Sequence, residues 1–150
     1  MIKPRSRRIR TDLIRIRLAE MRDSIKMVQE HLPRSYEEFW QLGIVKDGIY
    51  KRTEFAIENI LDICAILNTD LELGVPAGDD DILGHLQAEG VLPLPVIQTI
   101  RSMKAFRNIV VHRYGAIDDA IAFALLLRHI HDFDRFHSCV EAYLEQSVQP

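Results

Sequence analysis

The chain of 150 residues, with 47% hydrophobic and 27% charged residues, has the length and composition of one globular domain rather than of a disordered segment. No run of about 18 apolar residues predicts a membrane span, and the arginine-rich start is not followed by the apolar stretch of a secretory signal. We therefore expect a cytoplasmic protein without membrane attachment. The two cysteines, Cys64 and Cys139, lie far apart without metal-ligand spacing, and we expect reduced, buried thiols.

The formal net charge of −3 is unevenly distributed along the chain. Residues 1–17 contain seven basic residues and one acidic residue, a net charge of +6, which leaves −9 for the other 133 residues. A basic segment suits contact with a phosphate backbone, because neutralised phosphates release counterions. Such runs are more often a solvated helix start that pairs with acidic residues of the body or of a second subunit. We interpret residues 1–11 as a basic N-terminal arm or helix extension and residues 12–147 as one helical domain.

Apolar residues in the first part of the chain recur at helical spacing and predict a long helix from about residue 6 or 12 to about residue 31. This stripe consists of Ile14, Leu18, Met21, Ile25, Val28 and Leu32. Ser35 is followed three residues later by Glu38, which is the spacing of a capping box. The pair therefore predicts the start of a second, short helical segment.

Two glycines, Gly43 and Gly48, are expected to break or bend the chain before a second long helix from about residue 49 to residue 67. Residues 74–81, with the sequence GVPAGDDD, predict a loop. The aspartates of this loop can cap a short helix that continues through about Glu89. This part of the chain should therefore contribute one long and one short helix.

The last part of the chain predicts two further long helices. Pro95 suits the first turn of a helix over about residues 96–114, and Gly115 is expected to end it. Two aspartates open a final long helix over about residues 118–146. No sustained two-residue alternation and no hairpin dipeptide predicts a strand. The sequence therefore predicts an all-α antiparallel bundle of four main helices with one or two short ones.

The helix over residues 96–114 carries charged and polar residues in unusual places. On an ideal helix one sector of roughly 80° contains Val96, Ile100, Met103, Arg107, Val110 and Tyr114. Because a buried guanidinium is costly unless it is paired, Arg107 in this stripe implies an acidic partner, a cleft between subunits, or a site for an anion. Asn108 and His112 lie four residues apart on another side, where the amide can orient the imidazole. Arg107 and His112 are about 140° apart, so they converge only if the helix end distorts or a second subunit contributes.

The string RNIVVHRY at residues 107–114 resembles the R-x4-H-x-Y signature of HepT-like proteins, a minimal branch of the HEPN superfamily of all-α ribonucleases. The likeness includes the long first helix, the segment KRTEFAIENILDICAIL, the Asp-capped short helix before GVLP, and MKAFRNIVVHRYGAID, and it covers about residues 12–146. It implies a four-helix bundle of the HEPN type. The arginine-rich first ten residues have no counterpart in the family pattern, so any role for them rests on charge alone.

The resemblance implies a metal-independent endoribonuclease, acting as a toxin and restrained by an MntA-type nucleotidyltransferase antitoxin. At the matching positions, His112 would be the general base or acid and Arg107 would anchor the phosphate and the transition state. Asn108 would support them, and Tyr114 would be the residue to which the partner transfers AMP. Histidine titrates near neutrality and arginine offers a planar fork of donors, which are the groups that cleavage through the 2′-OH requires. From their charge we add as expected RNA contacts Arg5, Arg7, Arg8, Arg10 and Arg113.

The resemblance also implies a homodimer, in which two helix ends share one cleft that binds RNA, tRNA being one candidate, without a cofactor. One alternative is a non-catalytic helical module that docks a nucleotide or a nucleotidyltransferase partner in the same cleft. Another is a metal site, since His131, Asp134 and His137 are spaced by three on the last helix. Their spread of about 120° around one helix is poor for a single ion, and a solvated or interfacial face is the simpler interpretation.

Overall fold

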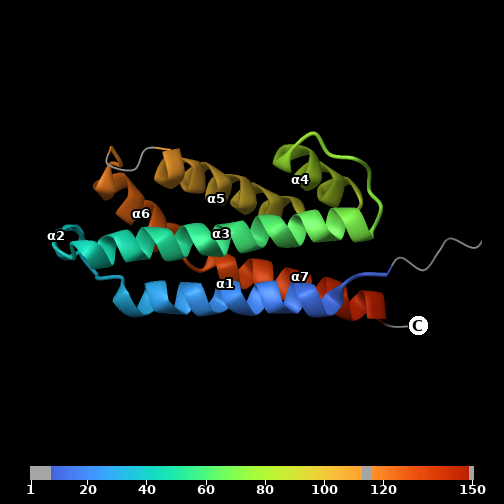
Figure 1. Ribbon diagram of the computed structural model, residues 1–150, viewed down its shortest axis with the longest axis horizontal. Helices are drawn as coiled ribbons and strands as arrows, with labels where there is room; N and C mark the ends of the chain where they lie inside the picture. The colour runs from blue at the N-terminus through green and yellow to red at the C-terminus, as the bar shows by residue number, and fades with distance from the viewer. Residues whose placement is uncertain (1–7, 113–115, 149–150) are drawn as a thin grey trace, which may run out of the picture.

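The computed structural model describes residues 8–112 and 116–148. Within these ranges the chain forms no strand, and its α-helices, labelled in Figure 1, are α1 (Thr11–His31), α2 (Tyr36–Trp40), α3 (Ile44–Asp70), α4 (Asp79–Ala88), α5 (Leu94–His112), α6 (Asp119–His129) and α7 (Asp132–Val148). None of these helices is long and apolar enough to cross a membrane.

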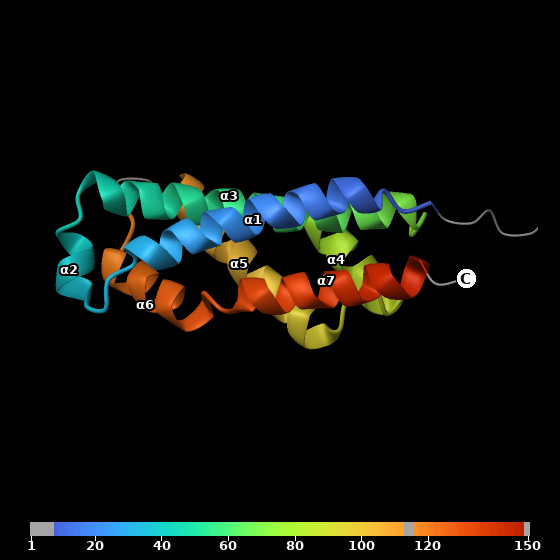
Figure 2. The same ribbon diagram turned by 90° about the horizontal axis from the view of Figure 1, so that it is seen from below.

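The long helices form an antiparallel bundle. α1 and α3 pack side by side, α5 packs on α3, and α7 packs on both α1 and α5 (Figures 1 and 2). The consecutive helices α6 and α7 together take the place of the fourth helix of the bundle. α2 packs against α6 at one end, and α4 packs on α3 and α5. This arrangement confirms the predicted four-helix bundle with short additional helices.

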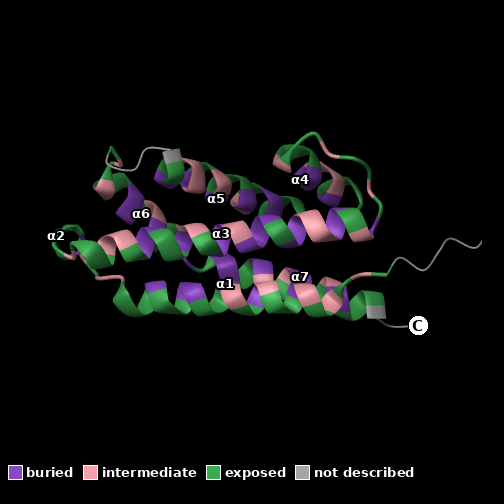
Figure 3. Cartoon of the chain, viewed as in Figure 1, coloured by how far each residue is buried: buried purple, intermediate pink, exposed green. Residues whose placement is uncertain are grey.

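The predicted apolar stripes form the core, as the burial colours of Figure 3 show. Five of the six stripe residues of α1 are at most 4% exposed, and Leu32 at the end of the stripe is half-buried. The matching buried residues of α5 are Val96, Ile100, Met103 and Val110. Burial also raises the pKa of the Cys64 thiol to about 12, whereas Cys139 is only partly buried. The expected buried thiol is therefore confirmed for Cys64 alone.

The start of α2 is confirmed by its cap, whereas the start of α3 differs from the prediction. Ser35 Oγ accepts a hydrogen bond from the backbone N–H of Glu38 at 3.2 Å. Gly43, with φ of +58°, precedes α3, which begins at Ile44. No break occurs at Gly48, because this residue continues the helix. A glycine inside a helix is less favourable than an alanine by only about 1 kcal/mol. The packing of α3 on α1 outweighs this cost.

The predicted short helix is α4, but its aspartates do not cap it as expected. Gly78 occupies the N-cap position, and no side chain makes a capping hydrogen bond there. Instead, Asp81 Oδ2 accepts a hydrogen bond from the backbone N–H of Ala77 at 2.8 Å. The three aspartates of the first turn still interact favourably with the positive end of the helix. One of them, Asp79, contacts α5.

The prediction of one final long helix is wrong, because the chain breaks between α6 and α7 at residues 130 and 131. The N–H groups of Asp134 and Arg135 bond to the carbonyl of His131 and start a new helix. The sequence conceals this break, since buried apolar residues keep helical spacing across it at Leu126, Ile130 and Phe133.

Candidate functional site

Arg107 extends from α5 to acidic residues on two other helices. Its Nη1 donates a hydrogen bond to Glu58 Oε1 on α3 at 2.5 Å. Its Nη2 lies 3.8 Å from Asp79 Oδ2 in the first turn of α4, and the arginine side chain is only 18% exposed. Of the three explanations that the sequence left open for an arginine in the stripe, the structure shows an acidic partner within the same chain.

Two carboxylates, those of Glu58 and Asp79, face Arg107. Lys104 Nζ lies 3.4 Å from Asp80 Oδ1 and 4.0 Å from Asp79 Oδ2, and so adds one positive charge beside Arg107. The Nε atom of Arg107 is buried and has no hydrogen-bond partner among the described residues. The guanidinium is therefore held by acids without using all of its donors.

Asp62 lies on α3, one turn after Glu58. Although the residue as a whole is exposed, partial burial of its carboxyl raises the pKa above the ordinary value of 3.8; Arg17 opposes this effect, and the charges of Glu58 and Asp79 add to it. The folded state therefore binds the Asp62 proton more tightly than the unfolded state does. It follows that the ionised carboxylate lowers stability as the pH rises above 3.8 through the raised pKa.

We expect Asp62→Asn to raise the free energy of unfolding at pH 7, because the amide removes an unfavourably placed charge. The gain should shrink as the pH falls toward about 4, where the wild-type carboxyl is increasingly protonated in the folded state. Urea unfolding at both pH values measures this difference, with Asp23→Asn on α1, a second exposed aspartate, as the control. A variant less stable than wild type at pH 7 would show that the attraction to Arg17 outweighs the effect of burial.

The other predicted residues of this segment are described only in part. Asn108 is half-buried, and α5 is helical through His112, but the side chain of His112 lies outside the described structure. Arg113 and Tyr114 also lie outside the described residues. Because the backbone is α-helical from Arg107 to His112, it shows no distortion that would bring the two residues to one side.

The described part of the basic N-terminal segment, from Arg8 onward, lies away from this helix end within one copy of the chain. Arg5 and Arg7 are outside the described residues, and Arg8 is exposed. Arg10 donates from Nε to Asp70 Oδ1 at 3.0 Å, and this interaction raises the pKa of the arginine. Asp70 is the last residue of α3, at the end of the bundle opposite the C-terminal end of α5 (Figure 1). One copy therefore does not bring Arg10 to the predicted catalytic residues.

The histidine-rich junction of α6 and α7 has no metal-binding geometry. Among the described residues, no three His, Cys, Asp or Glu side chains are placed to hold one ion. His129, rather than His131, has an acidic partner, with Nδ1 2.8 Å from Asp132 Oδ2. Burial lowers the pKa of His137, and the charge of Arg22 adds to this effect. The junction is therefore better explained by pairing and packing than by a metal.

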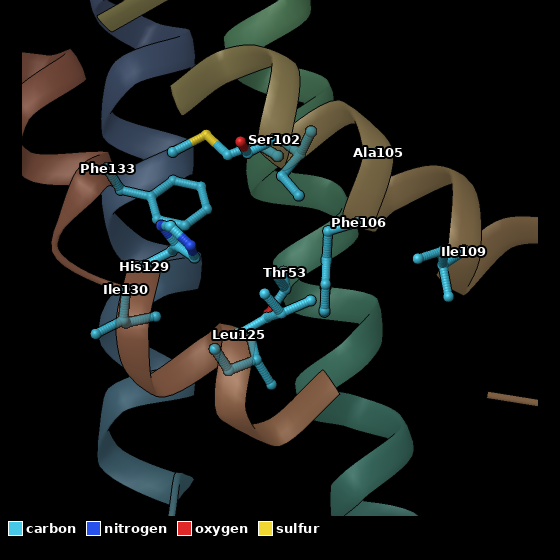
Figure 4. Close-up of a pocket in the computed structure, with 12 residues that line it drawn as sticks. Thr53, Ser102, Ala105, Phe106, Ile109, Leu125, His129, Ile130 and Phe133 are labelled. Atoms are coloured by element: carbon cyan, nitrogen blue, oxygen red, sulfur yellow. The ribbon is translucent and has the colours of Figure 1, made fainter. Parts of the chain in front are cut away.

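An apolar cavity of about 260 Å³ lies between α3, α5, α6 and α7 (Figure 4). Phe106 and Ile109 of α5 line it, together with Leu125 and His129 of α6. The hydroxyl of Thr53, which also lines it, already donates to the carbonyl of Ile49. This cavity could not be predicted from the sequence, because its walls come from four helices and the periodicity of one helix does not report how four pack together.

Comparisons with known proteins place the chain in a family. A family model described as Ribonuclease HepT-like matches residues 21–140. The mRNA nuclease HepT of Shewanella oneidensis is 24% identical over 131 residues, covering 87% of this chain and 98% of that protein. The structure of a tri-AMPylated Shewanella oneidensis HEPN toxin in complex with MNT antitoxin matches with a TM-score of 0.79 at 24% identity, covering 87% of this chain and 98% of that one.

A cytosolic protein of unknown function, YutE of Bacillus subtilis, has the same fold, with a TM-score of 0.79 at 20% identity and 95% coverage of both chains. These structural matches agree with the bundle observed here. The family model includes all of α3, α4 and α5, and with them Arg107 and His112. Because the match extends over most of the bundle, the chain belongs to the HepT-like ribonuclease family.

Proposed function

We propose that this chain is an endoribonuclease of the toxin–antitoxin kind that cuts RNA through its 2′-OH without a metal. The observation that carries the proposal is Arg107, a largely buried cation in the apolar stripe of α5, five residues before His112. The nuclease proposal is supported by membership in the HepT-like family and by a relative that is named as an mRNA nuclease. Arg107 would bind the phosphate at the cleavage site, and His112 would transfer protons there.

The chemistry follows from these two side chains. His112 takes the proton of the 2′-OH, the 2′-oxygen bonds to the adjacent phosphorus, and the bond from phosphorus to the 5′-oxygen breaks. The leaving 5′-oxygen takes up a proton, so the products end in a 2′,3′-cyclic phosphate and a 5′-hydroxyl. Arg107 stabilises the negative charge that develops on the phosphate oxygens, for which its planar fork of donors is suited.

The two residues would act together in a homodimer. On the regular helix observed for α5, Arg107 and His112 are five residues apart, which places them on different sides. A two-fold arrangement of two α5 ends would supply an arginine from one copy and a histidine from the other to the same phosphate. We therefore propose that the active form is a dimer with a shared cleft.

The proposed partner is a nucleotidyltransferase antitoxin. A similar HEPN toxin has been solved in a tri-AMPylated form with its MNT antitoxin. We propose Tyr114, two residues after His112, as the acceptor of AMP in this chain. A bulky anionic group at this end of α5 would repel the RNA backbone and occupy the space that a phosphate needs. This addition would silence the nuclease without changing the fold.

A non-catalytic binding module is the second candidate function, and the apolar cavity favours it. Ile109, which lines the cavity, is 40% exposed, so part of this wall remains open for a partner to cover. A module of this kind would bind a nucleotide or the nucleotidyltransferase through α5 and would not cut RNA. The two functions differ in one measurable property, which is the cleavage of RNA by the purified chain.

The experiment is to incubate purified, unmodified protein with total tRNA and with a structured RNA in EDTA. Mass spectrometry first confirms that Tyr114 carries no AMP. We expect the wild-type protein to cut RNA, and Arg107→Ala to be inactive while keeping a wild-type circular dichroism spectrum. If folded, unmodified wild-type protein leaves both RNAs intact, the proposed nuclease is wrong and the binding module takes its place.

A further inference from the structure

We propose that Glu58 is the positioning residue of Arg107, and that Asp79 is a weakly held occupant of the place that an RNA phosphate takes. This inference rests on the proposed function, because it assigns Arg107 to a phosphate. Glu58 and Asp79 both face the guanidinium of Arg107, but Glu58 lies within hydrogen-bond distance and Asp79 does not. We therefore treat the Glu58 contact as permanent and the Asp79 contact as displaceable by RNA.

The Glu58 contact has the properties of a fixed attachment. Arg107 Nη1 donates a hydrogen bond to Glu58 Oε1, and because both groups are charged this bond belongs to the strong, charge-assisted class. Glu58 lies near the middle of α3, a helix of 27 residues that packs on both α1 and α5. A guanidinium held from such a rigid element has a restricted orientation before RNA binds. Less side-chain conformational entropy is then lost when RNA binds.

The Asp79 contact is much weaker. Its Oδ2 lies 3.8 Å from Arg107 Nη2, which is too long for a hydrogen bond. The same oxygen is 4.0 Å from Lys104 Nζ, so it is shared by two cations. A phosphate oxygen could approach Nη2 to about 2.8 Å and form the charge-assisted hydrogen bond that Asp79 does not make.

The guanidinium also retains unused donors. Glu58 engages Nη1, and Nε is buried without a hydrogen-bond partner in the described structure. The arginine side chain is less exposed than either acid, so the two carboxylates lie toward solvent. A phosphate that approaches from solvent therefore meets Asp79 before it can reach Nη2, and it must displace this negative charge.

The two acids should consequently affect catalysis in opposite directions. Removing Glu58 frees the arginine, and misplacement of a catalytic group by about 1 Å can lower kcat by about 10²-fold. Removing the charge of Asp79 eliminates a repulsion of the phosphate, which at about 4 Å in water corresponds to about a fivefold lower KM. A purely structural role of the two ion pairs would not produce effects of opposite sign.

The test compares kcat and KM for one RNA substrate in EDTA. Glu58→Ala should lower kcat about 10²-fold, Glu58→Gln should retain most of the activity because its amide oxygen still accepts a hydrogen bond, and Asp79→Asn should lower KM about fivefold. The matched controls are Glu54→Ala, one turn earlier on α3, and Asp80→Asn, the exposed neighbour in α4. Urea unfolding confirms that each variant is folded under the assay conditions.

A double variant shows whether Glu58 acts through Arg107. In an Arg107→Ala background, which no longer cuts RNA, Glu58→Ala should cause no further loss of affinity for a non-cleavable 2′-O-methyl RNA, because the residue that it positions is already absent. Losses that multiply would overturn the proposal. It would also be overturned if Glu58→Ala matched Glu54→Ala in kcat, or if Asp79→Asn left KM unchanged or raised it.

Binding separates this inference from the proposed nuclease activity. The affinity for a 2′-O-methyl RNA, which lacks the nucleophile, should fall in Glu58→Ala and rise in Asp79→Asn. If the wild-type protein cuts no RNA but these affinities change as expected, the nuclease proposal fails while the positioning of Arg107 stands. If neither variant changes the affinity and the wild-type protein cuts RNA, the positioning proposal alone fails.

Discussion

Replacing His112 by alanine is expected to lower the rate constant for RNA cleavage by about 10²–10⁴-fold, the contribution typical of a general base or acid. Alanine cannot accept the proton of the 2′-OH, while the phosphate can still bind to Arg107. The loss should therefore fall on kcat rather than on KM. Because histidine titrates near neutrality, the wild-type rate should also change with pH around 6 to 7, and the residual rate of the variant should lose this dependence.

The matched control for this prediction is His129→Ala. This histidine lines the apolar cavity and bonds to Asp132, away from the proposed chemistry. Its removal should leave the wild-type pH profile unchanged. Single-turnover cleavage of an end-labelled RNA between pH 5 and pH 9 measures all three proteins. If His112→Ala cuts at the wild-type rate with the wild-type pH profile, His112 is not the general base or acid of the reaction.

Phe39→Ala is expected to lower the free energy of unfolding by about 3–5 kcal/mol, a large part of the stability of a typical domain. Phe39 is fully buried, with ring centroids 4.9 Å from Phe123 of α6 and 5.8 Å from Tyr50 of α3. Tyr50 in turn donates from its hydroxyl to Asp119 Oδ1, in the first turn of α6. The variant therefore leaves a cavity where α2, α3 and α6 meet.

The neighbouring Trp40→Ala is the control for Phe39→Ala. Trp40 is also an aromatic residue of α2, but it is 61% exposed, so we expect a change of no more than about 0.5 kcal/mol. Urea unfolding followed by circular dichroism measures both free energies. Equal losses in the two variants would show that the helical propensity of α2, rather than the packing of Phe39, controls stability at this end of the bundle.

The helices could be predicted from the sequence because each apolar stripe is a local pattern. The 3.6-residue period specifies which face of a helix is buried, and the stripe of α1 became a buried face as predicted. The cap at Ser35 was equally local. The break between α6 and α7 was not predictable in this way, since the apolar spacing from Leu126 to Phe133 continues through it.

The candidate site could be predicted only in part. The position of Arg107 in an apolar stripe implied that the guanidinium needs a partner, which is a consequence of desolvation. The identity of the partners was not accessible, because Glu58 and Asp79 come from two other helices and meet Arg107 only through the packing of α3, α4 and α5. The roles of His112, Asn108 and Tyr114 stay predictions from the motif.

If the 2′-OH is the attacking group, a substrate with a single 2′-OH should be cut at one place. We would incubate the wild-type protein in EDTA with a DNA oligonucleotide that carries one ribonucleotide at a mapped cleavage site. We predict one cut, directly 3′ of the ribonucleotide, with a 2′,3′-cyclic phosphate identified by mass spectrometry, and no cut when this position carries a 2′-O-methyl group. Cleavage of the 2′-O-methyl substrate, or products with a free 3′-hydroxyl and a 5′-phosphate, would contradict the proposed mechanism.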